Sequence, residues 1–364
     1  MRETFTVMIL GGTGVFGQRI ARRLVHHGDC RVIIAGRSQH GAGAAADEVG
    51  AREGRCVALP DGLAASLGDV DLVIHTVGPF QGQDYAVAET CLKAGVHYID
   101  LSDGRAFTEG FHTLDALARE NGVAAISGAS SVPGLSSTVV AHLSPAFARV
   151  DEIAMAIAPA NRVPRGPAVV AAILGTVGQP MRRWQAGAWR TAHGWQDMRR
   201  RKIDGLGPRW LAACDVPDMA LLPMAYPDVR TMTFHAGLEL SFLHWGLWAL
   251  SWPVRLGLLP SLLRFAPMMR RTARWFGKFG TDRGGMFVEL RGVDAAGAPL
   301  TKIWTVIAGS GDGPWIPALP AVILARQLAG GGGPEPGARA CLNLFDMDDF
   351  TRETNAFDIR WHVD

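Results

Sequence analysis

The sequence predicts an α/β protein, in which a doubly wound parallel sheet at the N-terminus is followed by a second, α+β domain. Three observations support this prediction. Between residues 5 and 130, short apolar runs alternate with amphipathic stretches, as in a parallel sheet with helices on both faces. A glycine-rich turn follows the first of these runs. All 11 tryptophans lie from Trp184 onward, so the two halves of the chain differ in composition.

Six strands are expected in the N-terminal sheet, because six apolar or β-branched runs are separated by turn-forming residues. Amphipathic segments between them predict helices, and a glycine just past each of three helices can form a left-handed cap. The expected strands are Phe5–Leu10, Arg31–Gly36, Cys56–Leu59, Leu72–Thr76, His97–Leu101 and Val123–Ser127. The expected helices are Val15–His27, Asp84–Ala94 and Phe111–Asn121, followed by Gly28, Gly95 and Gly122. This order of elements is typical of a Rossmann sheet.

Beyond Pro133–Gly134 the hydrophobic periodicity becomes mixed, which predicts an α+β domain. Within it, Arg291–Lys302 predicts a β-hairpin with a polar turn at Asp294. The run from 330 to 336 is rich in glycine and proline and predicts a surface connection, and 341–364 has little periodic signal. We therefore expect one domain over 1–137, a second over 138–330 that holds the substrate or a dimer contact, and a tail over 331–364 that packs back on the body.

Composition excludes several classes of protein. A chain with 48% hydrophobic and 19% charged residues is too apolar to be disordered, and a net charge of +2 gives no support for nucleic-acid binding. The five cysteines are widely spaced and form no C-x-x-C pair, which argues against a disulfide framework and a zinc site. We find no metal-ligand spacing and no secretory signal, so we expect a cytoplasmic protein without a metal.

The glycine-rich turn has the spacing of a dinucleotide-binding loop, G-x-G-x-x-G, between an expected strand and an expected helix. Gly12 would permit the tight turn, Gly14 would leave room for the pyrophosphate, and Gly17 would let the helix pack close to the sheet. Free N–H groups at the start of the helix attract phosphate. The residues expected to hold the nucleotide are Gly12, Thr13, Gly14, Val15, Phe16 and Gly17.

The end of the second strand distinguishes NAD from NADP. NAD sites usually have Asp or Glu there for the ribose 2′-hydroxyl, whereas this chain has Gly36-Arg37-Ser38. A guanidinium can bind a 2′-phosphate through two hydrogen bonds, and the serine hydroxyl can donate another. Arg37 and Ser38 therefore predict NADP as the cofactor.

The loop after the fourth strand is expected at the nicotinamide end of the site, because ligands bind in the crevice between the first and fourth strands of such a sheet. Gly78 would let the backbone approach the nicotinamide, and Pro79 would fix the direction of the loop. The alternative is a plain strand-ending turn. The predicted contacts are Val77, Gly78, Pro79 and Phe80.

Five motifs between Phe5 and Ser137 occur in the order known from one family: GGTGVFGQ, AGRS, HTVGPFQGQ, AGVHYIDLSDG and SGASSVPGLSS. This order resembles the NADP-binding domain of the saccharopine dehydrogenase-like (saccharopine reductase) family. The resemblance implies a Rossmann domain that holds NADP through 12–17 and 37–38, and a second α+β domain that closes over the cofactor. It also implies that residues 100–103 border the substrate. The family includes relatives that look like trans-acting enoyl reductases, so neither the substrate nor a single reaction class is implied.

Hydride transfer to an imine or carbonyl needs a proton source. The Tyr-x-x-x-Lys pair of short-chain dehydrogenases is absent, because no tyrosine is followed by a lysine four residues later. Asp103 ranks first among the candidates, since it closely follows the fifth strand, although a loop-capping role suits it equally. The further candidates are Tyr98, Ser130 and Ser131. The leading interpretation is an NADP-dependent oxidoreductase acting on a C=N, C=O or activated C=C bond, and the alternative is an NADP-binding or redox-sensing partner without turnover.

Charge and tryptophan are concentrated in the second part of the chain, where 181–283 carries a net charge of +9. Within it, Leu240–Val254 has no charged residue, and arginines follow at 255, 264, 270, 271 and 274. Such a helix is buried in protein or in lipid, but it is shorter than the ~20 residues that span a bilayer. We expect a homodimer, in which 240–275 forms a dimer contact or an ordinary core helix. Peripheral contact of 240–275 with an anionic membrane, together with an apolar or lipid-like substrate, is the alternative.

Overall fold

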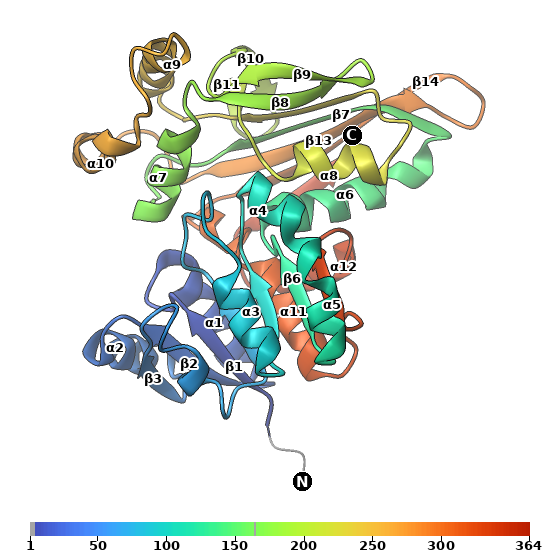
Figure 1. The fold of residues 1–364 in the computed structure, drawn as a ribbon. Coiled ribbons are helices and arrows are strands. Elements are labelled where there is room, and N and C mark those ends of the chain that lie inside the picture. Colours follow the sequence, from blue (N-terminus) through green and yellow to red (C-terminus); the bar gives the residue numbers. More distant parts are fainter. Residues whose placement is uncertain (1–3, 164) are drawn as a thin grey trace. The chain divides into compact units, whose positions relative to one another are not determined.

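The computed structural model describes residues 4–163 and 165–364, which form two compact units. The first unit extends to Leu135 and includes 314–353, and the second comprises 136–313 and 354–364. Figure 1 shows the course of the chain. The boundaries expected from sequence differ from these, because 314–330 belongs to the first unit and the expected tail is divided between the two.

The first unit is built on a parallel sheet of seven strands in the order β15-β6-β5-β4-β1-β2-β3. Because β1 lies between β2 and β4, the strand order reverses there, which creates the switch point at which ligands bind in such sheets. The strands are β1 Thr6–Leu10, β2 Arg31–Gly36, β3 Glu53–Cys56, β4 Leu72–His75, β5 His97–Asp100, β6 Ala124–Ser127 and β15 Gly337–Ala340.

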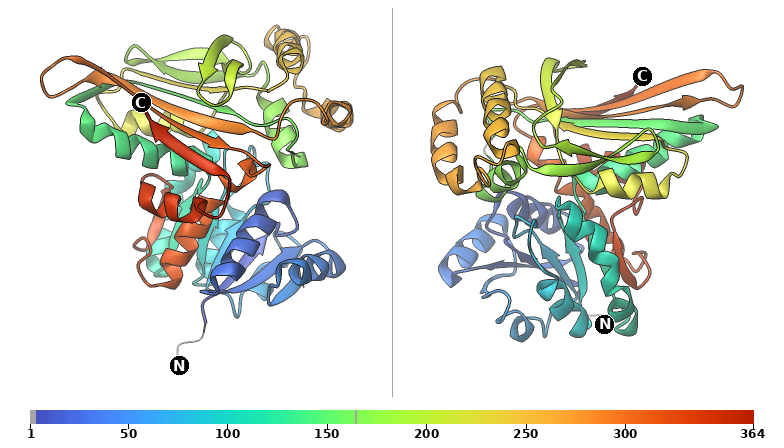
Figure 2. Two further views of the ribbon diagram at one scale, coloured as in Figure 1. Left: turned by 180° about the vertical axis from the view of Figure 1, so that it is seen from behind. Right: turned by 45° about the horizontal axis from the view of Figure 1, so that its top comes forward.

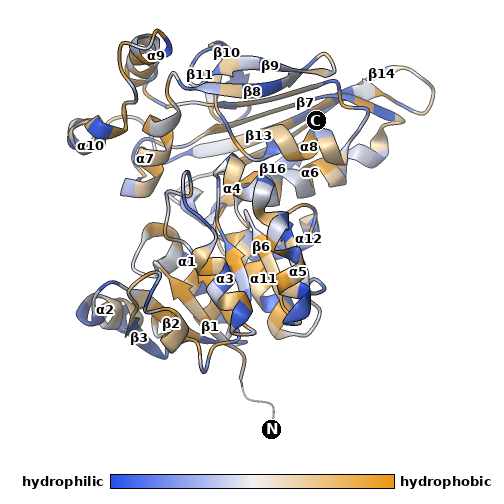
Figure 3. Cartoon of the chain, in the orientation of Figure 1, coloured by the Kyte–Doolittle hydropathy of each residue, from blue (hydrophilic) through white to orange (hydrophobic). Residues whose placement is uncertain are grey.

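Helices cover both faces of this sheet, so the central strands are fully buried and largely apolar. The helices α3 and α5 lie on the face toward the viewer in Figure 1, and α1 and α11 lie on the face seen in the left view of Figure 2. Figure 3 shows the strands in the colours of apolar residues. The helices are α1 Val15–His27, α2 Gln39–Val49, α3 Ala86–Lys93, α4 Arg105–Gly110, α5 Asp115–Glu120, α11 Leu319–Ala329 and α12 Met347–Thr354.

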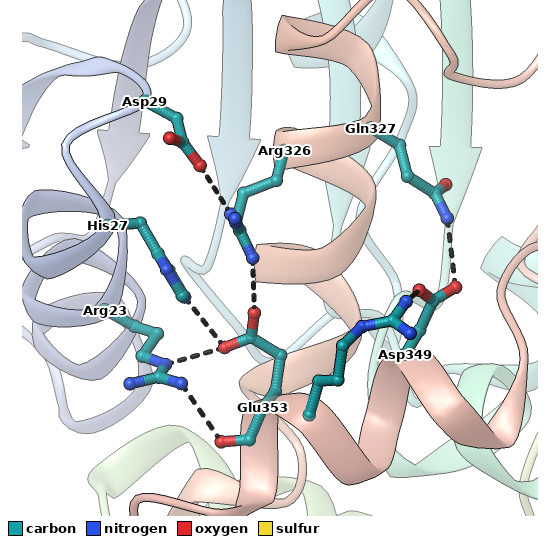
Figure 4. Close-up of polar contacts among 8 residues, drawn as sticks. Arg23, His27, Asp29, Arg326, Gln327, Asp349 and Glu353 are labelled. Atoms are coloured by element: carbon teal, nitrogen blue, oxygen red, sulfur yellow. Dashed lines mark hydrogen bonds and ion pairs between the residues drawn. The ribbon is translucent and has the colours of Figure 1, made fainter.

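Buried ion pairs attach the late segment 314–353 to the start of the chain (Figure 4). The carboxylate of Glu353, at the end of α12, is 3% exposed and accepts hydrogen bonds from Arg23 at 2.6 Å and from Arg326 at 2.7 Å. Nε2 of His27 lies 3.0 Å from the same carboxylate, and Arg326 also contacts Asp29 at 2.7 Å. These contacts join α12 and α11 to the last turns of α1.

Most of the elements expected in this unit are confirmed within two residues, and Gly28, Gly95 and Gly122 have φ between +67° and +73° as caps require. The third strand is an exception: it spans Glu53–Cys56, whereas the expected run Cys56–Leu59 lies largely beyond it. This strand forms the sheet edge and alternates charged and small residues, so it has no apolar run to detect. The expected helix Phe111–Asn121 is also divided, with a 3-10 turn over Phe111–Leu114 before α5.

The second unit contains a mixed sheet of seven strands in the order β10-β11-β12-β7-β13-β14-β16 and a separate β8–β9 hairpin. The expected hairpin around Asp294 is confirmed as β13–β14, with Asp294 Oδ1 accepting from the N–H groups of Ala296 and Ala298. The strands are β7 Arg149–Ala158, β8 Pro180–Gln185, β9 Ala188–His193, β10 Arg199–Ile203, β11 Gly207–Ala213, β12 Thr231–Ala236, β13 Gly284–Val293, β14 Pro299–Ala308 and β16 Ile359–Val363. The helices are α6 Ser136–Leu143, α7 Pro167–Thr176, α8 Asp218–Ala225, α9 Ser241–Arg255 and α10 Ala266–Trp275.

The C-terminal stretch is more regular than its sequence indicates. Residues 341–364 have little periodic signal, yet they contain α12 and the sheet strand β16. Strand β16 pairs antiparallel with β14, from Trp304 opposite Val363 to Ala308 opposite Ile359. Pairing with an existing edge supplies the hydrogen bonds that a short, half-buried strand lacks by itself.

Candidate functional site

The loop between β1 and α1 has the geometry of a phosphate-binding turn. Gly11 takes φ +77°, and its carbonyl accepts from the N–H of Gly14 at 2.8 Å. Thr13 and Gly14 lie at the exposed crest of the turn, whereas Gly12 and Gly17 are buried. The exposed crest thus lies in front of the N-terminus of α1, where the helix dipole favours negative charge.

Each glycine of the turn has a different steric role. From the sequence, Gly12 is expected to form the tight turn. In the structure, the residue with left-handed backbone is Gly11. A Cβ at Gly12 would lie 2.8 Å from the Ile34 side chain. A Cβ at Gly17 would lie 2.5 Å from the Gly11 carbonyl oxygen and 2.7 Å from Gly12 Cα, so only glycine lets α1 start this close to the turn. Val15 and Phe16, in the first turn of α1, are half-buried.

A depression of about 550 Å³ lies beside this turn, where β2 passes into α2. Arg37 and Ser38 form part of its lining together with Thr13 of the glycine turn. Both are exposed, and Ser38 caps α2 by accepting from the N–H of Gly41 at 3.2 Å, which leaves its hydroxyl hydrogen free to donate. The lining also includes Glu48, whose carboxylate is paired with Arg22. The lining residues are Thr13, Gln18, Arg37, Ser38, Gly41, Ala42, Ala44, Ala45 and Glu48.

The loop after β4 lies against the glycine turn. A Cβ at Gly11 would be 3.0 Å from the Val77 side chain, and Thr76 Oγ1 donates to the Leu10 carbonyl at 2.8 Å. Val77 is exposed, and Gly78 and Pro79 are half-buried. Phe80 is different, because its ring is 4% exposed and packs on His75 and Phe107, with centroids 5.1 and 5.4 Å away. Its side chain therefore packs into the core, and its backbone remains part of the loop.

A buried carboxylate fixes the loops after β5 and β6. Asp100, at the end of β5, is fully buried, and its Oδ1 accepts from the N–H of Ser102 at 2.9 Å and of Gly128 at 2.8 Å. The Ser127 hydroxyl donates to the same oxygen at 3.0 Å. Burial raises the pKa of Asp100 to about 7, although these N–H groups oppose the shift. Asp100 is thus a positioning residue for the two loops at the carboxyl edge of the sheet.

The two proposed catalytic residues lie in different surroundings. Asp103 stands on the half-buried loop after β5, where Gln81 Nε2 donates to its Oδ1 at 3.2 Å. Burial raises the pKa of Asp103, against the opposing hydrogen bond from Gln81. Tyr98 is fully buried; its hydroxyl lies 2.9 Å from His75 Nδ1 and its ring stacks on Phe111. Because Tyr98 occupies a core position, only Asp103 of this pair lies on a loop at the sheet edge.

The comparison with known families concerns this first unit. Residues 7–126 match the model of the saccharopine dehydrogenase NADP binding domain. These residues, about one third of the chain, are similar to that NADP-binding domain. The chain is an NAD(P)-binding oxidoreductase, and the glycine turn, the β2–α2 depression and the loop after β4 all lie within the matched residues. No curated protein sequence matches the chain.

Solved structures share the fold of the whole chain. Apo saccharopine dehydrogenase (L-Glu forming) from Saccharomyces cerevisiae superposes with a TM-score of 0.68 at 14% identity, over 99% of this chain and 100% of that chain. An amine dehydrogenase from Mycobacterium smegmatis superposes with a TM-score of 0.50 at 14% identity, over 94% and 96% of the two chains. At these identities the likeness shows a common fold.

Two glutamines in the NADP-binding domain were not detected from sequence. Gln83 Nε2 donates to the carbonyls of Val77 at 2.8 Å and Pro79 at 2.7 Å, which holds the loop after β4 from outside. Gln81 contacts Asp103, as described above. The only signal for them is the motif HTVGPFQGQ, in which they follow the loop. A glutamine side chain has no fixed role in this motif, so only the structure shows which groups Gln81 and Gln83 contact.

Proposed function

We propose that the protein is an NADP-dependent oxidoreductase that passes hydride between the nicotinamide and a C=N, C=O or activated C=C bond. The observation that carries the choice of NADP is the depression at the β2–α2 junction, lined by Arg37 and Ser38. No carboxylate stands at 36–38 to receive a ribose 2′-hydroxyl, and Glu48 is engaged with Arg22. A guanidinium and a hydroxyl together suit a 2′-phosphate.

The residues of the domain fit the nucleotide in other respects. The crest at Thr13 and Gly14 leaves backbone groups open for the pyrophosphate, and the helix N-terminus behind them favours its charge. The loop after β4, held by Gln83, would border the nicotinamide, with Val77 exposed on it. When bound, NADP supplies or accepts the hydride.

Asp103 is proposed as the proton donor or acceptor that accompanies hydride transfer. Burial raises the pKa of Asp103, which increases the share of the neutral acid near neutral pH. Gln81 holds one of its carboxyl oxygens, so the group has a defined orientation. Asp100, beneath the same loop, fixes its backbone through Ser102.

The substrate is proposed to be apolar or lipid-like. Support comes from the second unit, where large apolar side chains such as Phe242, Leu256 and Trp275 are more than half exposed. We also propose a cytoplasmic location, because five widely spaced cysteines, an odd number, do not form the disulfide framework of a secreted protein.

A turnover assay tests this function. Purified protein is mixed with NADPH and pools of imines, keto acids and enoyl thioesters, and NADPH absorbance is followed. We expect oxidation with at least one pool, reduced about 100-fold or more in Asp103→Asn, while NADPH affinity stays unchanged. Matched protein carrying Asp61→Asn, on an exposed loop, should keep full activity. Tight NADPH binding without turnover on any pool would instead favour a non-catalytic NADP-binding or redox-sensing protein.

A further inference from the structure

One region of the second unit combines exposed apolar side chains with a high density of positive charge. It spans residues 240–280 and contains α9, a 3-10 turn at Leu263–Phe265, and α10; we name it the 240–280 surface. Figures 1 and 2 show α9 and α10 at one end of the second unit, opposite the turn that joins β13 to β14. In Figure 3 this region carries both apolar and polar colours.

Helix α9 has a buried stripe and an exposed apolar stripe on opposite faces. One stripe, at 244, 247, 251 and 254, is buried, and its Leu247 and Val254 pack with Leu174 and Trp195 in a core of the second unit. The opposite stripe, at 242, 245, 249, 252 and 256, repeats every three or four residues and is exposed. Phe242 is 54% exposed and Leu256 is 65% exposed. A surface helix normally has polar residues on its outer face, so this outer stripe needs an apolar neighbour.

Helix α10 continues this exposed apolar surface and adds charge. None of its residues is buried, and Met268 and Trp275, seven residues apart and therefore on one face, are 61% and 70% exposed. Arg271 neighbours them on the helix surface, Arg270 and Arg274 lie on other sides of the same helix, and all three are exposed. In the part of the chain that the structure describes, none of these three arginines forms an ion pair.

The charge of the region has one sign. Between 240 and 280 the sequence has six arginines and lysines and no aspartate or glutamate. Two of the arginines lie over aromatic rings, Arg255 over Trp252 at 5.1 Å and Arg264 over Phe265 at 4.7 Å. Cations beside exposed tryptophan, leucine and methionine are the composition of helices that lie in the interface of an anionic bilayer.

We propose that the 240–280 surface docks on anionic lipid bilayers, with the outer stripe of α9 and Met268 and Trp275 of α10 inserted among the acyl chains and the arginines at the lipid phosphates. The contact is interfacial. No helix among the described residues is long and apolar enough to cross a membrane.

Two observations favour lipid over other occupants of this surface. A symmetric contact with a second copy of the chain would bring two sets of six cations together without a carboxylate between them, and like charges facing each other oppose association. A polyanion such as nucleic acid would satisfy the arginines, but it offers little apolar area to Phe242, Leu256, Met268 and Trp275.

Vesicle flotation with the full chain tests the proposal. The vesicles are phosphatidylcholine alone, or phosphatidylcholine with about one third phosphatidylserine, at 50 mM and 500 mM salt. We expect the protein to float with the anionic vesicles at low salt, to float much less at high salt, and to stay at the bottom with the neutral vesicles. Absence of flotation with anionic vesicles at low salt would overturn the proposal.

Variants locate the contact. Replacing Arg270, Arg271 and Arg274 by Glu should lower the partition coefficient about 100-fold or more, because each basic residue near the surface contributes about fivefold. Met268→Ser with Trp275→Ser should also weaken flotation and should make the remaining binding more sensitive to salt. The control changes three exposed arginines elsewhere to Glu, Arg31, Arg190 and Arg360, and should retain binding within about threefold. Thermal melting of each variant confirms that it is folded.

Two outcomes would contradict the assignment to lipid. Equal losses in the control and in the α10 variants would show a non-specific charge effect rather than a docking surface. Light scattering that shows a dimer in the unmodified protein and a monomer in Met268→Ser/Trp275→Ser, without vesicle binding by either, would show that a second copy covers the surface.

Discussion

At the scale of single residues, Arg37 decides which nucleotide the domain accepts. Arg37→Asp replaces a cation at the carboxyl end of β2 by the acid that NAD-binding sites have there. We expect the Kd for NADPH to rise about 10- to 100-fold, as the loss of charge-assisted hydrogen bonds implies, while the Kd for NADH changes by a few-fold or less. The matched control is Arg31→Asp at the other end of the same strand, which should leave both constants unchanged. Equal effects of Arg37→Asp on the two nucleotides would contradict the assignment.

Glu353 attaches segment 314–353 to helix α1 of the first unit. Its buried carboxylate pairs with Arg23, His27 and Arg326 (Figure 4), so Glu353→Gln leaves the buried Arg23 without its counter-ion. We expect a loss of about 3–5 kcal/mol in the free energy of unfolding, measured in urea. Glu48→Gln is the control, because Glu48 pairs with the neighbouring Arg22 in an exposed pair, and such pairs contribute about 1 kcal/mol or less. Similar losses in both variants would show that Glu353 has no special role.

The same carboxylate has a defined pH dependence. Burial raises the pKa of Glu353, but hydrogen bonds from His27 and Arg23 outweigh it, so the net pKa is lowered. A carboxyl with a lowered folded pKa stabilises the fold above its unfolded pKa, and this stabilisation disappears as the pH falls through the folded pKa. The gap in stability between the unmodified protein and Glu353→Gln should therefore narrow below about pH 4.5.

At the scale of secondary-structure elements, the contact of α1 with the glycine turn is the critical one. A Cβ at position 17 would lie 2.5 Å from a backbone oxygen, so Gly17→Ala must displace α1 or the turn. We expect a loss of about 1–3 kcal/mol in stability, together with weaker NADPH binding. Gly43→Ala in α2 is the control, because nothing lies within 4 Å of a Cβ there. It should stabilise the protein by up to about 1 kcal/mol, since alanine favours a helix. NADPH affinity unchanged in Gly17→Ala would contradict the role of this turn.

The elements also show what a sequence can predict. Helix α1 was predicted at its observed ends, because the apolar period, the glycine turn before it and Gly28 after it all indicate the same boundaries. Strand β3 was misplaced, because an edge strand with Glu53 and Arg55 needs no apolar run. Strand β16 was missed, since its pairing with β14 depends on a partner about 50 residues away along the chain.

In the candidate site too, local patterns are predictable from sequence and contacts between distant segments are not. Arg37 and Ser38 could be named from sequence, because their role depends on their position at the end of one strand. The contacts of Gln81 and Gln83 depend on two loops meeting, which no local pattern encodes. Tyr98 was ranked from its place near a strand end, but alternation along β5 directs its side chain into the core.

At the scale of the whole molecule, Asp100 in the first unit and Asp218 in the second are both fully buried. Burial raises the pKa of Asp100 in the first unit and of Asp218 in the second to about 7. A carboxyl with a raised folded pKa destabilises the fold fully above that pKa, and the penalty declines as the pH falls from there toward the unfolded pKa. Lowering the pH from 8 to 6.5 should therefore stabilise the protein by on the order of 1 kcal/mol for each group.

Calorimetry of the aspartate variants checks this expectation. Asp100→Asn and Asp218→Asn each remove one titrating group, so each should flatten the dependence of the melting temperature on pH between 8 and 6.5. The exposed Asp61→Asn should leave that dependence unchanged. A melting temperature that rises with pH in this window, or variants with the slope of the unmodified protein, would show that neither aspartate controls stability there.

The nucleotide preference of the unmodified protein tests the central claim most directly. Calorimetric titration with NADPH and with NADH, at one pH and one salt concentration, gives the two dissociation constants. The geometry at Arg37 and Ser38 predicts that NADPH binds at least about tenfold more tightly than NADH. Equal affinities, tighter binding of NADH, or no binding of either nucleotide would contradict the account.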